Sequence, residues 1–135
     1  MKEMKTIKAL LINPFSVMNS NKLELVDVPV DPKCNNEFDL HSCYKIIDCD
    51  LVEFVHYKLI DYMLVVDEEG LLKSEQEFFR VPRCGQEIFC GKALMFKTDE
   101  NQNYIDMTEE DKTKLNIQFL TREQAWILAK YDSNS

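Results

Sequence analysis

Glycine, proline and histidine are scarce in this chain, and their scarcity excludes several kinds of site. Among 135 residues there are three glycines, four prolines and two histidines, His41 and His56. No glycine-rich phosphate loop and no P-loop lysine motif occurs, and a helical His-Glu-x-x-His motif and a Gly-x-Ser-x-Gly motif are absent as well. The chain therefore lacks the sequence signatures of P-loop enzymes, zinc proteases and serine hydrolases.

Long hydrophobic runs are also missing. No apolar run approaches the ~20 residues that a membrane helix requires. Residues 1–13 carry lysines ahead of a short apolar patch, but they lack the longer apolar core and the cleavage site of a signal peptide. We therefore expect a cytoplasmic protein without a membrane partner. The five cysteines are an odd number, which in a chain without a secretion signal predicts reduced thiols rather than a disulfide framework.

Basic residues are fewer than acidic residues in this chain. The chain has 24 Asp and Glu against 16 Lys and Arg, a net charge of −8. This argues against direct binding of nucleic acid, which needs cations to replace the phosphate counterions. The acidic residues cluster in 48–69 and 98–111, and they form either a solvated surface that keeps the protein soluble or a surface for a basic protein partner, such as a nucleic-acid-binding protein. On the second interpretation, the candidate contact residues are Asp67, Glu68, Glu69, Glu109, Glu110 and Asp111.

The hydrophobic content and the length of the chain are sufficient for one globular domain. Hydrophobic residues make up 45% of the chain, so we expect a single α+β domain over 1–135, with a core at about 5–118 and a terminal helix at about 121–131. The predicted fold is a mostly antiparallel sheet of about five strands, with a short helix after the second strand and helices at the C-terminal end. Strands are predicted at 5–12, 22–28, 52–55, 62–66 and 88–97, and helices at about 39–47, 109–116 and 122–131.

The first two strands should form a hairpin. Alternation in the second places Leu23 and Leu25 on one face and Val26 and Val28 on the other. Proline cannot donate to a strand ladder, so Pro29, followed by Pro32, is predicted to end the sheet there.

Residues 44–73 hold the densest run of β-branched and aromatic residues. The strand at 62–66 is apolar on both faces, which predicts a position inside the sheet. Residues 67–70 should then turn the chain into Leu71-Leu72, with Gly70 supplying the left-handed residue of a three-residue hairpin.

The second half of the chain contains short sequence signals for a bulge, a hairpin and the starts of two helices. Gly91 suggests a bulge within the strand at 88–97, and residues 98–107 suggest a hairpin that returns through Tyr104-Ile105. Thr108 with Asp111 resembles a capping box, and Thr121 with Gln124 repeats this signature before the terminal helix.

The connection at 74–87 contains the most unusual stretch, in which two aromatic residues are flanked by two arginines. Phe78 and Phe79 either cover the core or, with Arg80 and Arg83, form a contact site. Cys84 follows directly, and nearby arginines would lower the pKa of an exposed thiol, so a small enzyme or ligand-binding module using this segment is the alternative function.

A zinc site is disfavoured by the spacings. Cys34, His41, Cys43 and Cys49 lie near one another in the sequence, but not at the intervals of a zinc knuckle. We expect no metal and no cofactor.

The chain carries four short stretches in order, Lys8 to Pro14, Asp67 to Leu72, Gly91 to Met95 and Met107 to Glu110. Together they resemble a small family of unknown function found in phages, plasmids and conjugative elements of mainly Gram-positive bacteria. The resemblance covers most of 5–118, leaves out the helix after Thr121, and assigns no catalytic residue. Arg80-Val81-Pro82-Arg83 replaces the Asn-Arg or Pro-Asn loop of that family.

The resemblance and the charge together predict a non-catalytic accessory protein of a mobile element. Such a protein would bind a host or phage protein through its acidic surface, inhibition of a defence nuclease being one such activity.

Overall fold

The computed structural model describes residues 5–16, 22–31, 37–38, 40–47, 49, 52–56, 62–67, 77–82, 87–101 and 103–133. Within these residues the strands form a seven-stranded sheet of order β3-β2-β1-β8-β5-β4, with β9 paired to β8, and a three-stranded sheet of order β10-β6-β7. The elements are β1 Lys5–Ile12, β2 Leu23–Asp31, β3 Glu37–Phe38, α1 Leu40–Ile46, β4 Val52–His56, β5 Tyr62–Asp67, β6 Phe78–Arg80, β7 Ile88–Cys90, β8 Ala93–Thr98, β9 Tyr104–Ile105, α2 Glu109–Leu115, β10 Gln118–Leu120 and α3 Arg122–Ser133.

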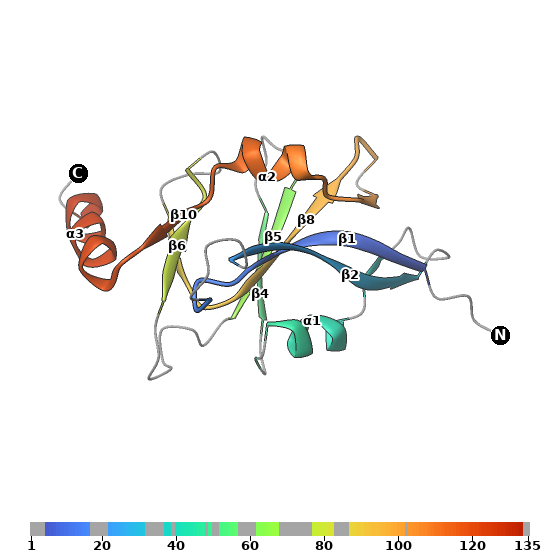
Figure 1. The fold of residues 1–135 in the computed structure, drawn as a ribbon, viewed down its shortest axis with the longest axis horizontal. Coiled ribbons are helices and arrows are strands. Elements are labelled where there is room, and N and C mark those ends of the chain that lie inside the picture. Colours follow the sequence, from blue (N-terminus) through green and yellow to red (C-terminus); the bar gives the residue numbers. More distant parts are fainter. Residues whose placement is uncertain are drawn as a thin grey trace.

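This arrangement confirms the predicted α+β class, its antiparallel pairing and its C-terminal helices (Figure 1). The second, smaller sheet was not predicted. Its strands β6, β7 and β10 are three residues each, too short for a period of two to stand out in the sequence. The segment 74–87 therefore contains a strand where a long connection was expected.

The hairpin of β1 and β2 forms as predicted, with a register that runs from Lys5↔Val30 to Ile12↔Leu23. Leu23 and Leu25 pack on one face of the sheet and Val26 and Val28 on the other, which confirms the predicted alternation. The prediction that Pro29 ends the strand is wrong, because β2 continues to Asp31. Pro29 pairs with Thr6 of β1, and on the other side β3 pairs only with Val30 and Asp31, so Pro29 occupies an edge-like position that tolerates a missing N–H.

The seven-stranded sheet is buried on both faces. On β5, Leu64 and Val66 face one cluster of core residues, while Met63 and Val65 face another. The helix α1 covers the second face, and α2 lies on the opposite side of the sheet (Figure 1). β5 lies between β4 and β8, as its apolar residues on both faces predicted.

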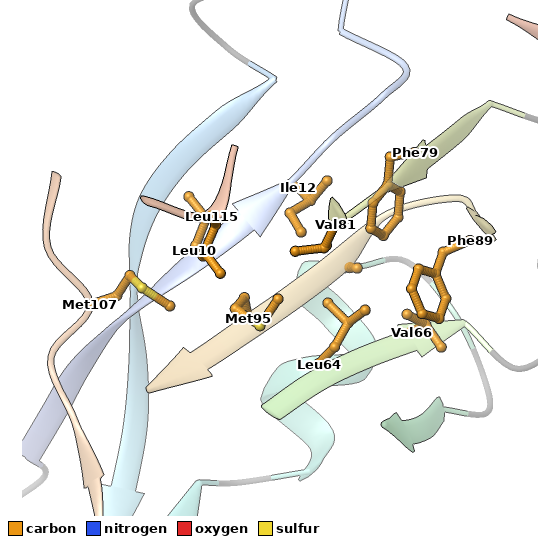
Figure 2. Packing of buried hydrophobic residues seen from close by; sticks show 11 residues of the cluster. Leu10, Ile12, Leu64, Val66, Phe79, Val81, Phe89, Met95, Met107 and Leu115 are labelled. Atoms are coloured by element: carbon orange, nitrogen blue, oxygen red, sulfur yellow. The ribbon is translucent and has the colours of Figure 1, made fainter. Parts of the chain in front are cut away.

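The small sheet and α2 close the first face. In Figure 2, Phe89 of the small sheet lies next to Val66 of β5, Phe79 lies beside Val81, and Leu115 of α2 lies next to Leu10 of β1; all belong to one cluster of buried residues. The rings of Phe79 and Phe89 stack with their centroids 5.5 Å apart. Burial of these aromatic rings fixes the small sheet on the large one.

Gly91 separates β7 from β8, which belong to different sheets, so one continuous strand with a bulge at 88–97 is wrong. Its φ is +93°, a conformation that side-chain-bearing residues rarely adopt, and its N–H donates to the carbonyl oxygen of Glu77 at 2.9 Å. The left-handed backbone at this glycine redirects the chain from the small sheet into the large one.

Both predicted capping boxes are confirmed. Thr108 Oγ1 accepts from the Asp111 N–H at 3.2 Å, and Asp111 Oδ2 accepts from the Thr108 N–H at 2.9 Å. At the start of α3, the Thr121 N–H donates to Gln124 Oε1 at 2.9 Å, and the Gln124 N–H donates to Thr121 Oγ1 at 3.1 Å. These bonds satisfy backbone donors that the first turn of a helix leaves unpaired.

None of the helices in the described parts of the chain has the length and apolar character needed to cross a membrane. The predicted turn at Gly70 lies outside the described residues.

Candidate functional site

Asp111 is the centre of a polar network that involves three elements of the fold. Its side chain is 2% exposed. The Tyr62 hydroxyl donates to Oδ1 at 2.7 Å, and Lys97 Nζ lies 3.1 Å from Oδ2. Thr108 donates to Oδ2 from its N–H at 2.9 Å and from its hydroxyl at 2.8 Å. The carboxylate therefore ties β5, β8 and α2 together.

Burial alone raises the pKa of Asp111, but hydrogen bonds from Tyr62, Thr108 and Lys97 outweigh it and hold the pKa at about 2. The group is ionised at neutral pH, and both of its oxygens accept from protein donors. A carboxylate in this state is a poor general base, because its affinity for a proton is low. We interpret the network as structural.

The acidic segment 98–111 has mainly intramolecular roles. Asp99 Oδ1 accepts from the N–H groups of Asn101 and Asn103, each at 2.9 Å, and these bonds, that of Asn103 foremost, lower its pKa. Asp106 Oδ1 accepts from the Lys8 N–H at 2.8 Å, which fastens the chain before α2 to β1. Asp99 therefore stabilises a turn, and Asp106 holds the chain before α2 against β1.

Glu109 and Glu110 lie in the first turn of α2 and are each 76% exposed. Glu109 pairs with Lys112 at 3.1 Å and Glu110 with Lys114 at 3.5 Å, so part of their charge is compensated within the helix. Asp111, proposed as a third contact residue of this surface, is buried. The exposed contact surface predicted here is thus reduced to two partly compensated glutamates.

The other acidic candidates are placed differently. Asp67, at the end of β5, is buried. Glu68 and Glu69, and with them the acidic turn, lie outside the described residues.

The aromatic pair of the 74–87 segment faces inward. Phe78 and Phe79 are buried, as expected for residues that cover the core, and the surface does not present them as contact residues. Arg80 is half-buried and reaches the surface. Arg83 and Cys84 lie outside the described residues.

Arg80 borders an open groove of about 580 Å³ between β6, β10 and α3. Gln118 of β10 lies opposite Arg80 of β6 in the sheet register. From α3, the groove is lined by residues at positions 124, 127 and 128, the spacing of a single helix face. Its lining residues are Arg80, Gln118, Phe119, Leu120, Gln124, Ile127 and Leu128.

A cation lines this groove although the protein carries a net charge of −8. Arg80 Nε donates to Gln118 Oε1 at 2.7 Å. Lys22 Nζ lies 5.0 Å from the centroid of the Phe119 ring, within the range of a cation–π contact. Lys22 is not among the residues that line the groove, so Arg80 is the one charged residue among the described lining residues, and its charge is opposite in sign to that of the whole chain.

The helix α3 rests on the small sheet through Ala125, which is buried with Phe78 and Cys90. The same helix exposes 64% of Trp126 and 50% of Ile127 to solvent. Ile127 lines the groove, whereas Trp126 is exposed on another side of the helix.

The cysteines and histidines give no reactive constellation in the described part of the chain. Burial raises the pKa of the Cys90 thiol, which disfavours the nucleophilic thiolate. No three His, Cys, Asp or Glu side chains gather as potential metal ligands among the residues that the structure describes. Cys84, the predicted nucleophile, lies outside them, and so do the side chains of His41 and His56.

A family model described as a domain of unknown function, DUF3846, matches residues 7–120. The chain belongs to the DUF3846 family. No curated protein and no solved structure matches it. The assignment confirms the expectation of a family of unknown function, with the terminal helix beyond the match. The groove consequently combines β6 and β10 of the DUF3846 domain with a helix outside the matched residues.

Arg80 is the one groove residue that the sequence singled out. Leu128 was predicted only as a residue of the terminal helix at about 121–131. Phe119 and Leu120 lie between two predicted helices, where the run from 117 to 120 alternates too briefly to stand out as a strand. Their proximity to Arg80 depends on the pairing of β10 with β6, which the sequence does not reveal.

Proposed function

We propose that this DUF3846 protein is a non-catalytic accessory protein of a phage- or plasmid-type element, and that it acts by binding another protein. The observation that carries the proposal is the open groove between β10 and α3, together with the exposed Trp126 and Ile127 on α3. Trp and Arg are enriched among the residues that contribute most to protein–protein binding, and exposed apolar patches mark interaction surfaces.

The charge of the chain supports a basic partner. A net charge of −8 attracts positively charged proteins over long distances and accelerates their encounter. The proposed partner is a cytoplasmic protein with a basic, nucleic-acid-binding surface, such as a defence nuclease. The resemblance to proteins of mobile elements supports the same class of partner.

The two surfaces would have different roles. Most acidic residues of 98–111 have intramolecular partners, so they contribute mainly to the long-range field. The groove offers half-buried and apolar side chains, which form short-range contacts. We therefore place the main contact at the groove and assign steering to the acidic surface.

The alternative of a small enzyme or ligand-binding module has less support. The groove falls within the roughly 300–1,000 Å³ typical of ligand sites, but it is open, whereas such sites usually enclose most of a small ligand. An open groove suits a segment of a protein chain.

The test compares a double variant, Trp126→Ser with Ile127→Ser, against Phe15→Ser. Phe15 is another exposed large apolar residue, and it lies outside the groove. Each tagged protein is expressed in the host, and co-purifying proteins are quantified by mass spectrometry at low and high salt. We expect a specific partner with the wild type and with Phe15→Ser, and at least a tenfold reduction with the double variant.

Circular dichroism establishes that the variants fold. Substitution of exposed residues usually changes stability by no more than about 0.5 kcal/mol. Equal recovery of the partner by the double variant, or no specific partner with the wild type at low salt, would contradict the proposed function.

A further inference from the structure

Arg80 is positioned to bind an anion within the groove. Its backbone belongs to the central strand of the small sheet, and its Nε–H is fixed by Gln118 Oε1 at 2.7 Å. A guanidinium group carries five N–H donors, and this bond uses one of them, which leaves the two terminal amino groups outside it. Their planar arrangement matches the two oxygens of a carboxylate.

The surroundings of Arg80 favour a carboxylate in an amphipathic ligand. Arg80 is the one charged residue among the described residues that line the groove. Leu120 and Ile127 offer apolar contact area beside this cation. A ligand that places a carboxylate beside a large apolar side chain would complement both features.

The amides of the groove favour an extended chain. The amide oxygens of Gln118 and Gln124 already accept from Arg80 Nε and from the Thr121 N–H, which leaves the NH₂ groups of both side chains to donate to a ligand. An extended peptide presents unpaired backbone C=O groups to such donors, whereas a helix satisfies its own. Because the groove is open, a chain can pass along it, which suits an internal acidic residue rather than a terminal carboxylate.

We infer that the groove binds an extended peptide segment of the partner protein, in which an internal Asp or Glu beside a large apolar residue pairs with Arg80. The inference rests on the proposed function and specifies its contact. It also gives the complex an orientation, since the overall acidic field attracts a basic partner while the groove selects a local acidic residue within it.

The probe is a phage-displayed library of random linear peptides fused to the coat protein at their C-terminal end, selected against the immobilised full chain. We expect enriched peptides to share an Asp or Glu at a fixed spacing from a large apolar residue. An enriched peptide is then synthesised with blocked ends, together with its Glu→Gln or Asp→Asn version. Loss of a charged hydrogen-bond partner should weaken binding by about tenfold or more.

Three protein variants complete the test. Arg80→Gln should bind the acidic peptide about tenfold more weakly than the wild type does, and it should bind the amide version as well as the wild type does. Arg80→Glu should select peptides with Lys or Arg in place of the acidic residue. Lys45→Gln removes the same charge from an exposed residue of α1, on the other face of the large sheet, and should bind like the wild type. The peptide exchange requires no change in the protein, so it decides the question even if an Arg80 variant fails to fold.

Several results would overturn the inference: no enrichment by the wild type, enriched peptides without acidic residues, or equal affinity of Arg80→Gln for the acidic peptide. The proposed function fails separately. Partner recovery that requires Trp126 and Ile127 but not Arg80 would support protein binding and remove the acidic peptide.

Discussion

Asp111→Asn removes one charge from the network that joins β5, β8 and α2, and it leaves the shape of the side chain almost unchanged. The asparagine amide can still accept from the Tyr62 hydroxyl. Its NH₂ group, however, would replace an oxygen that accepts from Thr108 and Lys97, so donors would face donors. The substitution therefore breaks the ion pair and one half of the capping box.

The size of the effect follows from the pKa. The network lowers the pKa of Asp111 from the ordinary 3.8 to about 2. At about 1.4 kcal/mol for each unit, the charged form stabilises the fold by about 2 kcal/mol. Breaking a fully buried ion pair costs about 3–5 kcal/mol, and Lys97 is 27% exposed, which reduces this cost. We expect Asp111→Asn to lower the free energy of unfolding by about 2–4 kcal/mol at pH 7.

The pH dependence has a definite sign. The pKa is lower in the folded state than in the unfolded state, so the stabilisation is complete above the unfolded pKa of 3.8 and is lost as the pH falls toward 2. The difference in stability between the wild type and Asp111→Asn should be constant above about pH 5 and should shrink between about pH 4 and pH 2.

Urea unfolding followed by far-ultraviolet circular dichroism at pH 7 and pH 3 measures both effects. Glu110→Gln is the matched control, because Glu110 is the neighbouring acid of the same helix and is 76% exposed. This control should cost less than about 0.5 kcal/mol. A loss below about 1 kcal/mol for Asp111→Asn at pH 7, or a difference that does not change with pH, would refute the structural role of the network.

Two further predictions concern the same fold. Tyr62→Phe removes the hydroxyl that donates to Asp111 at 2.7 Å, so it should lower the free energy of unfolding, measured in urea, by about 1–3 kcal/mol. It should also raise the pKa of Asp111 in an NMR titration, and an unchanged pKa would contradict the hydrogen bond. Gly91→Ala should cost about 1–2 kcal/mol through its backbone alone, because φ is +93° and a Cβ there meets no atom within 4 Å. Equal urea midpoints for Gly91→Ala and the wild type would show that this backbone is not strained by a side chain.

The sequence predicted the elements whose signals are local. The strands at 5–12 and 62–66 are long enough for their apolar pattern to identify both the strand and its faces. The starts of α2 and α3 were readable because a capping box needs only two side chains at a fixed spacing. Glycine at 91 indicated an irregularity, but a bulge and a change of sheet require the same residue, and only the pairing of the flanking strands distinguishes them.

The candidate site was less predictable because its residues meet through tertiary structure. Arg80 and Gln118 are 38 residues apart, and Tyr62 and Asp111 are 49 residues apart. Neither contact leaves a local pattern in the sequence. Arg80 was identified only because two arginines flanking two aromatic residues are unusual in an acidic chain.

The net charge of the chain and the position of Arg80 should affect different rates of binding. The net charge of −8 acts over long distances and is screened by salt, so it should govern the rate of association. Arg80 is half-buried, and a pair formed there is screened less, so it should govern the rate of dissociation. If the acidic residues of 98–111 formed the contact itself, salt would change both rates together. Salt therefore separates a steering surface from a docking groove, because added salt should slow association while leaving dissociation from the groove nearly constant.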